Sequence, residues 1–183
     1  MDAELASMVR EMRDRQEIYD CLMRYCRGID RFDREVMASA YHPGALDEHG
    51  SFVGPAEQFI DWAIATHGKY HRRTQHMITN HLCTIDGDTA HAESYYLFRS
   101  LNIDPPFHSI FSGRYIDRLE RRDGRWGIVA RICTVDVRDQ HSDPHGDELD
   151  GTHLATARDR SDPSYMRPVA VDPARFTGTT EGH

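Results

Sequence analysis

The spacing of hydrophobic residues divides the chain into a helical first part and a strand-forming second part. In the first part, apolar side chains recur at three- and four-residue intervals, which predicts helices over residues 5–26, 33–40 and 54–68. Gly28 is expected to end the first helix or to lie just beyond its end, and Gly68 to end the third helix, which has Pro55 in its first turn. A short strand is expected over residues 46–52, after the turn formed by Pro43 and Gly44.

In the second part the period changes from 3.6 to two, which predicts strands over residues 75–85, 89–101, 108–120 and 125–137. The connections at 86–88 and 121–125 are short and contain Asp-Gly, as in tight hairpins, and 102–106 joins the middle pair. Such a chain forms an antiparallel meander, and the strand near residue 50 is expected at its edge. The pattern therefore predicts an α+β fold in which three N-terminal helices pack on one face of a curved sheet.

The length and composition favour one domain followed by an extension. The chain has 183 residues, of which 39% are hydrophobic and 28% charged, enough for one core of ordinary size. Apolar periodicity ends near residue 140, so we expect a domain over 1–140 and a C-terminal extension over 141–183. The extension is predicted to be extended and mobile, or else to pack on a neighbouring subunit, for which "SYMRPVAV" supplies apolar residues.

Charge and hydropathy exclude some classes of partner. The formal net charge of -8 and the pI near 5.8 argue against nucleic-acid binding, which needs a basic face. The dense basic run "HGKYHRR" at residues 67–73 is expected to be a solvated loop. No apolar run approaches the roughly 20 residues of a membrane span, and the N-terminus is too charged for a signal peptide. We therefore expect a cytoplasmic protein without nucleic-acid or membrane partners.

The cysteines and histidines do not form a familiar metal site. The four cysteines lie inside predicted helices or strands and are expected to be buried. The twelve histidines show neither HExxH nor Cys/His knuckle spacing, so no metal is expected.

Asp30 and His76 are the candidate catalytic pair. Asp30 follows the first helix, and His76 shares one face of its strand with Ile78 and Asn80, toward the helix-covered side or a cavity under it. An Asp bonded to one imidazole nitrogen fixes the tautomer and makes the other nitrogen a better base. Such a pair supports elimination, dehydration or enolisation without a cofactor.

Arg131 and Tyr25 are candidate partners of that pair. Arg131 is the one charged residue on an otherwise apolar strand face and needs a carboxylate, a ligand or water, because a buried unpaired ion costs several kcal/mol. A structural ion pair is one reading, and polarisation of a substrate carbonyl is the other. Tyr25 lies five residues before Asp30 and could reach the same cavity. The residues expected to line the cavity and bind substrate are Tyr41, His49, Asn80, Tyr96 and Phe111.

The order of these features resembles the SnoaL-like branch of the nuclear transport factor 2-like superfamily over roughly residues 10–138. The resemblance is carried by "YCRGID", "HPGA", "QHMITNHLCTIDGDTAHA" and "RDGRWGIVAR". Within that branch, the sequence pattern is most similar to scytalone dehydratase, γ-hexachlorocyclohexane dehydrochlorinase and bile-acid 7α-dehydratase. The resemblance implies a cone-shaped cystatin-like fold, a mixed or antiparallel sheet bent around a central pocket.

The resemblance also implies roles for residues. Asp30 and His76 stand where those enzymes have their Asp–His pair, Arg131 matches the last-strand arginine of the dehydrochlorinase, and Tyr25 matches a tyrosine of the bile-acid enzyme. The implied function is a cofactor-independent lyase or isomerase acting on a small, largely apolar, cyclic substrate. The alternatives are a non-catalytic ligand-binding or partner subunit and a polyketide cyclase-like protein. A homo-oligomer is expected, with a trimer favoured over a dimer.

Overall fold

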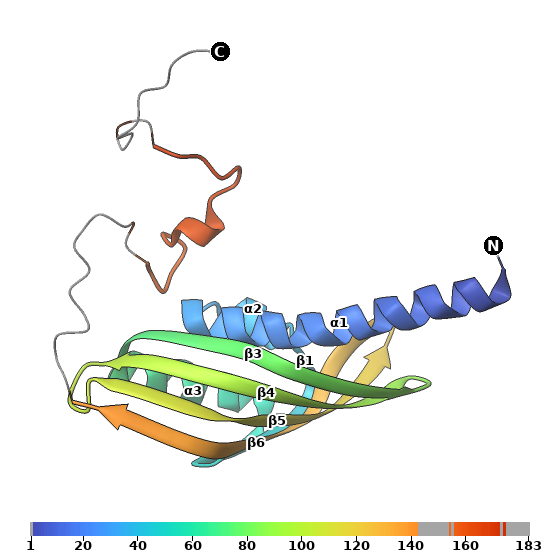
Figure 1. The fold of residues 1–183 in the computed structure, drawn as a ribbon, viewed down its shortest axis with the longest axis horizontal. Helices are drawn as coiled ribbons and strands as arrows, with labels where there is room; N and C mark the ends of the chain where they lie inside the picture. Colours follow the sequence, from blue (N-terminus) through green and yellow to red (C-terminus); the bar gives the residue numbers. More distant parts are fainter. Residues whose placement is uncertain (1, 143–153, 155, 173, 175–183) are drawn as a thin grey trace.

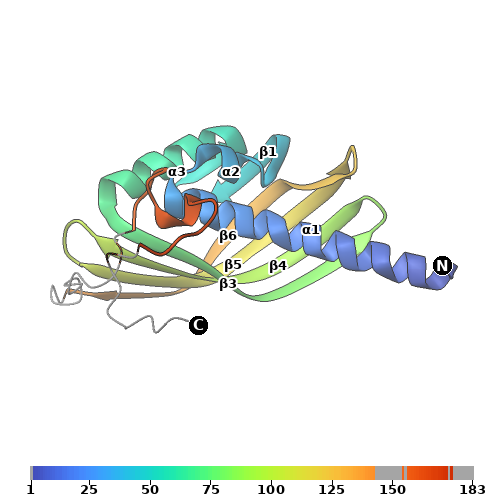
Figure 2. The ribbon, with the colours of Figure 1, turned by 90° about the horizontal axis from the view of Figure 1, so that it is seen from above.

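The computed structural model describes residues 2–142, 154, 156–172 and 174. Three helices, α1 (Ala3–Arg31), α2 (Arg34–Ala38) and α3 (Ala56–Tyr70), are combined with one six-stranded sheet. The strands are β1 (Tyr41–His49), β2 (Phe52–Pro55), β3 (His71–Asp86), β4 (Thr89–Asn102), β5 (His108–Arg122) and β6 (Arg125–His141). In Figure 1, α1 lies along the sheet with α2 beside its C-terminal half, and Figure 2 shows α3 next to α2 and β1. This α+β arrangement confirms the predicted fold class.

The sheet order is β2-β1-β6-β5-β4-β3, and the last four strands form the predicted antiparallel meander. The expected single strand over 46–52 is wrong, because Gly50 takes a positive φ of 65° and turns the chain there. The segments on either side, β1 and β2, pair antiparallel, and β1 also runs parallel to β6. The sheet is therefore mixed, and β1 brings its side chains next to the last strand.

Gly28 does not end the first helix. The helix continues to Arg31, and Phe32 provides the left-handed C-cap with a φ of 51°. A Cβ added to Gly28 would lie 2.5 Å from both the backbone nitrogen and the Cβ of Met37. Gly28 is thus required for close packing of α1 on α2, and this packing lets the last turn of α1 carry Asp30 inward. Gly68 likewise lies inside α3, which ends at Tyr70.

Gly28→Ala is therefore expected to destabilise the fold by about 1–3 kcal/mol or more, the usual cost of overpacking. Gly68→Ala is the matched helical control, since the nearest atom to its added Cβ is 3.6 Å away in the Phe32 ring. Alanine at that position should be neutral or stabilising, because glycine is a poor helix former. Urea unfolding of both variants measures the difference, and equal stabilities would contradict this account of Gly28.

The described part of the extension packs on its own chain. The Tyr165 hydroxyl donates to Asp33 at 2.6 Å, and the Arg158 guanidinium donates to the carbonyl of His71 at 2.7 Å. Residues 143–153 lie outside the described residues, and packing of the extension on a neighbouring subunit stays a prediction. None of the described helices is long and apolar enough to cross a membrane.

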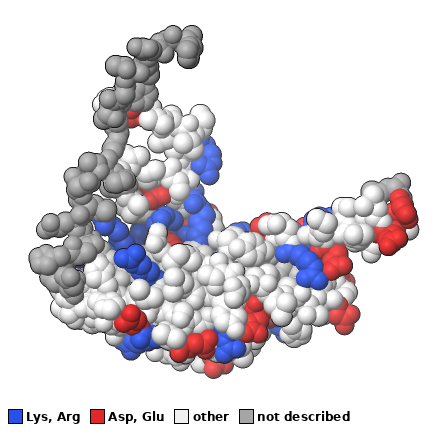
Figure 3. Space-filling model, in the orientation of Figure 1, with Lys and Arg blue, Asp and Glu red and all other residues white. Residues whose placement is uncertain are grey.

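Basic residues gather beside this contact, although the chain is acidic overall. Figure 3 shows Lys and Arg side chains where the described extension meets the helices and the sheet. A hollow of about 310 Å³ there is lined by five arginines, Arg31, Arg72, Arg73, Arg99 and Arg158. Two of them come from the basic run at 67–73, and the fold adds the other three from distant parts of the sequence.

Candidate active site

Asp30 and His76 form a doubly bonded pair. The Nδ1 atom of His76, on β3, is 2.7 Å from Oδ1 of Asp30, and the backbone N–H of His76 donates to Oδ2 at 2.8 Å. Burial alone would raise the pKa of Asp30, but the charge and hydrogen bonds of His76 outweigh it and lower that pKa. Asp30 is therefore an ionised acceptor for two donors. This fixes the imidazole so that Nδ1 carries hydrogen toward Asp30 and Nε2 is the available base.

The pair borders a cavity of about 440 Å³, with His76 in its wall and Asp30 behind the imidazole. Helices α1 and α3 and strands β1, β3, β4, β5 and β6 all contribute to the walls. The rings of Phe59, Trp62, Phe98 and Phe111 make the cavity largely apolar. The His76 ring packs 4.7 Å from the Phe98 ring, centroid to centroid. The Nε2 atom has no hydrogen-bond partner among the described residues, so it is available to a substrate.

Arg131 does not line this cavity. Its guanidinium is completely buried and forms a bidentate pair with Asp117 on β5, with N–O distances of 2.7 and 2.8 Å. It also lies over the rings of Tyr25 and Tyr115, 4.4 and 4.2 Å from their centroids. The Asp117 charge outweighs the effect of burial and raises the pKa of Arg131 well above its usual value. The ion-pair reading of Arg131 fits the structure, and direct polarisation of a substrate by this side chain does not.

The other expected site residues divide into two groups. Tyr25, His49, Tyr96 and Phe111 line the cavity, whereas Tyr41 and Asn80 do not. Tyr41 is buried behind the wall, where its hydroxyl donates to Asp47 at 2.7 Å. Asn80 is exposed because the pairing of β3 with β4 shifts between Ile78 and His81, which breaks the alternation expected from His76.

Two histidines of the wall were not foreseen. The basic run at 67–73 is not the expected loop: it forms the end of α3 and the start of β3, and His67 and His71 line the cavity. Burial and neighbouring positive charge lower the pKa of His71 to about 4 and that of His67 well below its usual value. Both imidazoles are thus neutral at physiological pH.

Among the described residues, no three His, Cys, Asp or Glu side chains are grouped as metal ligands.

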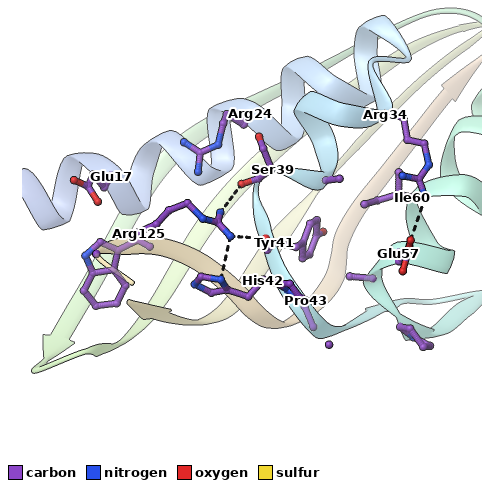
Figure 4. A pocket seen from close by; sticks show the side chains of 17 residues that line it. Glu17, Arg24, Arg34, Ser39, Tyr41, His42, Pro43, Glu57, Ile60 and Arg125 are labelled. Atoms are coloured by element: carbon purple, nitrogen blue, oxygen red, sulfur yellow. Dashed lines mark hydrogen bonds and ion pairs between the residues drawn. The ribbon is translucent and has the colours of Figure 1, made fainter. Parts of the chain in front are cut away.

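A larger hollow of about 830 Å³ lies elsewhere, between α1, the β1 segment and α3 (Figure 4). Several of its polar groups already bind one another: Arg125 donates to the carbonyls of Ser39 and Tyr41 and contacts His42. Among the described residues that line this hollow, no carboxylate is bonded to a histidine. The smaller cavity, which has the Asp30–His76 pair at its wall, is therefore the candidate active site.

Comparison with known proteins identifies the fold family. A model of the SnoaL-like domain matches residues 10–132. A hexachlorocyclohexane dehydrochlorinase from Novosphingobium barchaimii superposes with a TM-score of 0.68 and 16% identity, over 77% of this chain and 99% of that one. A candidate scytalone dehydratase from Novosphingobium aromaticivorans gives 0.65 and 16%, over 76% and 97%.

A Mycobacterium tuberculosis protein of unknown function gives a TM-score of 0.62 and 26% identity, over 70% of this chain and 75% of that one. No functionally curated protein matches the sequence significantly. The solved structures agree with the family match in fold, and another neighbour is described as having a cystatin-like fold. The chain belongs to the SnoaL-like domain family.

Proposed function

We propose that this protein is a cofactor-independent lyase or isomerase in which His76 is the general base and Asp30 orients it. The observation that carries the proposal is the Asp30–His76 pair at the wall of an apolar cavity, in which Nε2 of His76 has no hydrogen-bond partner among the residues that the structure describes. A base placed in this way contributes about a hundredfold to ten-thousandfold in rate.

The reaction follows from the positions of these groups. His76 Nε2 removes a proton from a carbon of the bound substrate, and the electron pair of that C–H bond forms a new double bond. In an elimination, the leaving group departs with the electrons of its own bond; in an isomerisation, the proton returns to another carbon. Asp30 stabilises the imidazolium through the 2.7 Å contact to Nδ1.

The walls indicate the class of substrate. The cavity volume of about 440 Å³ and the rings of Phe59, Trp62, Phe98 and Phe111 suit a small, mostly apolar, cyclic molecule. The names of two structural neighbours, a dehydrochlorinase and a candidate dehydratase, support an elimination. They do not identify the substrate of this chain.

A generic elimination tests the base directly. The probe is 5-nitro-1,2-benzisoxazole, a flat bicyclic compound from which removal of one ring proton breaks the N–O bond and releases a coloured phenolate. The wild-type protein should accelerate this reaction beyond free imidazole at the same pH, and His76→Gln should lower kcat/KM roughly a hundredfold or more. His81→Gln is the matched control, because His81 lies on the same strand, bonds Ser94 and does not line the cavity.

Failure of the wild-type protein to exceed free imidazole would contradict the proposal and favour a non-catalytic binder. Equal activity of His76→Gln and His81→Gln would also contradict it.

The surface supports the proposed homo-oligomer. Leu82, Ile116 and Ile132 belong to one cross-strand row, in which Glu93 lies between Leu82 and Ile116, and these three apolar residues are 72%, 41% and 46% exposed. Apolar side chains grouped on a sheet face favour burial against a partner. We favour a trimer over a dimer, and sedimentation velocity distinguishes these two oligomeric states.

A further inference from the structure

A second carboxylate–imidazole pair borders the same cavity. His49 and Asp47 lie two residues apart on β1, and Nδ1 of His49 is 2.5 Å from Oδ1 of Asp47. The other oxygen of Asp47 accepts the Tyr41 hydroxyl at 2.7 Å, and Asp47 itself is only 1% exposed. The Asp47 carboxylate is thus fully engaged in holding the His49 imidazole in place. His49 lines the cavity, whereas Asp47 does not.

The remaining nitrogen of His49 is directed to Tyr25. The distance from Nε2 of His49 to the Tyr25 hydroxyl is 3.4 Å, and both residues line the cavity. The His49 ring stacks on Phe59 with a centroid distance of 4.5 Å, which fixes its plane. The Tyr25 ring lies 6.2 Å from the His76 ring and 6.3 Å from the His49 ring. Tyr25 is therefore next to both imidazoles.

The surroundings keep His49 charged. Burial lowers its pKa, but the hydrogen bond with Asp47 and the interaction with the Cys133 side chain outweigh burial and raise the pKa to about 9. Burial raises the pKa of Tyr25 well above its usual value, so the phenol stays protonated. The titratable groups facing His49 are Asp47 on β1, Tyr25 from α1, Tyr115 from β5 and Cys133 from β6, while α3 presents the Phe59 ring.

These protonation states define a direction for proton transfer. An imidazolium donates from both nitrogens, so Nδ1–H of His49 is directed to Asp47 and Nε2–H to the oxygen of Tyr25. The hydroxyl hydrogen of Tyr25 is then free to be donated into the cavity. A hydrogen bond from a cation stabilises the phenolate, and so it opposes the effect of burial on the acidity of Tyr25.

We infer that Tyr25, recharged by His49, is the general acid of this site and protonates an oxygen of the substrate. The inference rests on the proposed function, since it supplies the acid for the step in which His76 is the base. The C–H proton passes to His76, its electron pair forms the double bond, and the C–O bond breaks. The departing oxygen takes the Tyr25 proton, and Tyr25 regains one from His49.

This arrangement selects the class of leaving group. Hydroxide and alkoxide are poor leaving groups and need a proton, whereas chloride leaves without one. A buried acid is therefore of use for dehydration, or for enolisation at a carbonyl oxygen, and of little use for dehydrochlorination. The structure favours a substrate with a hydroxyl or carbonyl oxygen at the Tyr25 end of the cavity.

The test compares two probes that differ only in their leaving group. Unsubstituted 1,2-benzisoxazole releases a more basic phenolate than its 5-nitro derivative, so its ring opening depends more on an acid. His49→Gln and Tyr25→Phe should each lower kcat/KM for the unsubstituted probe about tenfold or more beyond the loss for the nitro probe. His76→Gln should lower both by the same factor, and His81→Gln should leave both unchanged.

The pH profile provides a readout that a structural role would not change. After subtraction of the hydroxide reaction, kcat/KM of the wild-type protein for the unsubstituted probe should fall as the pH rises through about 9, where His49 loses its proton. His49→Gln should lack this fall. Equal losses for both probes, or a fall that persists in His49→Gln, would overturn the acid assignment. If His76→Gln is still inactive in that case, the proposed base stands; an active His76→Gln would remove both.

Discussion

Asp30→Asn is expected to lower kcat/KM about a hundredfold to ten-thousandfold, although it changes only one acceptor atom. Asp30 accepts two hydrogen bonds, one from Nδ1–H of His76 and one from the backbone N–H of the same residue. Asparagine offers one oxygen and one NH2 group. If its oxygen accepts the backbone N–H, its NH2 group faces Nδ1 and forces the proton onto Nε2. The base is then blocked, because Nε2 is the atom that faces the substrate.

The opposite orientation of asparagine does not rescue the site. Its NH2 group would then face the backbone N–H of His76, leaving two donors opposed at a contact that is now 2.8 Å long. Asp20→Asn is the matched control, because Asp20 lies on the same helix and, within the described part of the chain, accepts only from Gln16. Steady-state kinetics with the nitro probe measure both variants, and circular dichroism confirms that they are folded. An Asp30→Asn protein as active as the control would contradict the orienting role.

Asp117→Ala is expected to cause the largest loss of stability, about 3–5 kcal/mol, because it leaves the Arg131 guanidinium buried without its carboxylate. Both side chains of this pair are 0% exposed. The stacked rings of Tyr25 and Tyr115 cannot replace a bidentate carboxylate as a counter-charge. For a domain of this size the loss corresponds to a decrease in Tm of roughly 6–20 °C.

Asp136→Ala provides the control for that measurement. Asp136 pairs with Arg114 across the same two strands, but these side chains are 41% and 31% exposed, so their pair contributes about 1 kcal/mol or less. Thermal unfolding of the two variants separates the buried pair from the exposed one. A similar decrease in Tm for both would show that Arg131 is not held in the way described.

The partner of Arg131 could not be read from the sequence because of a one-residue irregularity in the hairpin. Pairing outward from Arg122 and Arg125 would place Arg131 opposite Ile116. The register shifts between Arg118 and Leu119, and Asp117 becomes the residue opposite Arg131. A shift of one residue moves side chains to the other face of a strand, so the shift decides whether the guanidinium meets a carboxylate.

The same kind of irregularity explains the placement of Asn80. The hairpin turns and the presence of the four long strands could be predicted, because Asp-Gly turns and period-two alternation are local signals. The strand ends could not, since β3 begins earlier, at His71, and β6 ends later, at His141, than expected. Asp30 and His76 lie together, with 2.7 Å between Oδ1 and Nδ1, as the resemblance implied. The parallel pairing of β1 with β6 depends on contacts between residues distant in sequence. The position of His49 next to Tyr25 depends on this pairing, so neither could be predicted from local signals.

His67 had a signal in the sequence that was not used. Phe59, Ala63 and His67 follow one another at four-residue intervals and all line the cavity. The predicted helix over residues 54–68 already contained this stripe, so His67 could have been added to the expected wall, whereas His71 is the first residue of β3, where a loop was expected. Glycine in a helix interior lowers stability modestly and does not by itself end the helix.

The central claim is that Asp30 holds His76 with its Nε2 atom free of hydrogen and exposed to the cavity. Long-range ¹H–¹⁵N NMR of the histidine side chains measures which nitrogen of each neutral imidazole carries the proton. In the wild-type protein, neutral His76 should be protonated on Nδ1, and in Asp30→Asn the proton should move to Nε2. A wild-type His76 protonated on Nε2, with the same signals in Asp30→Asn, would contradict the account.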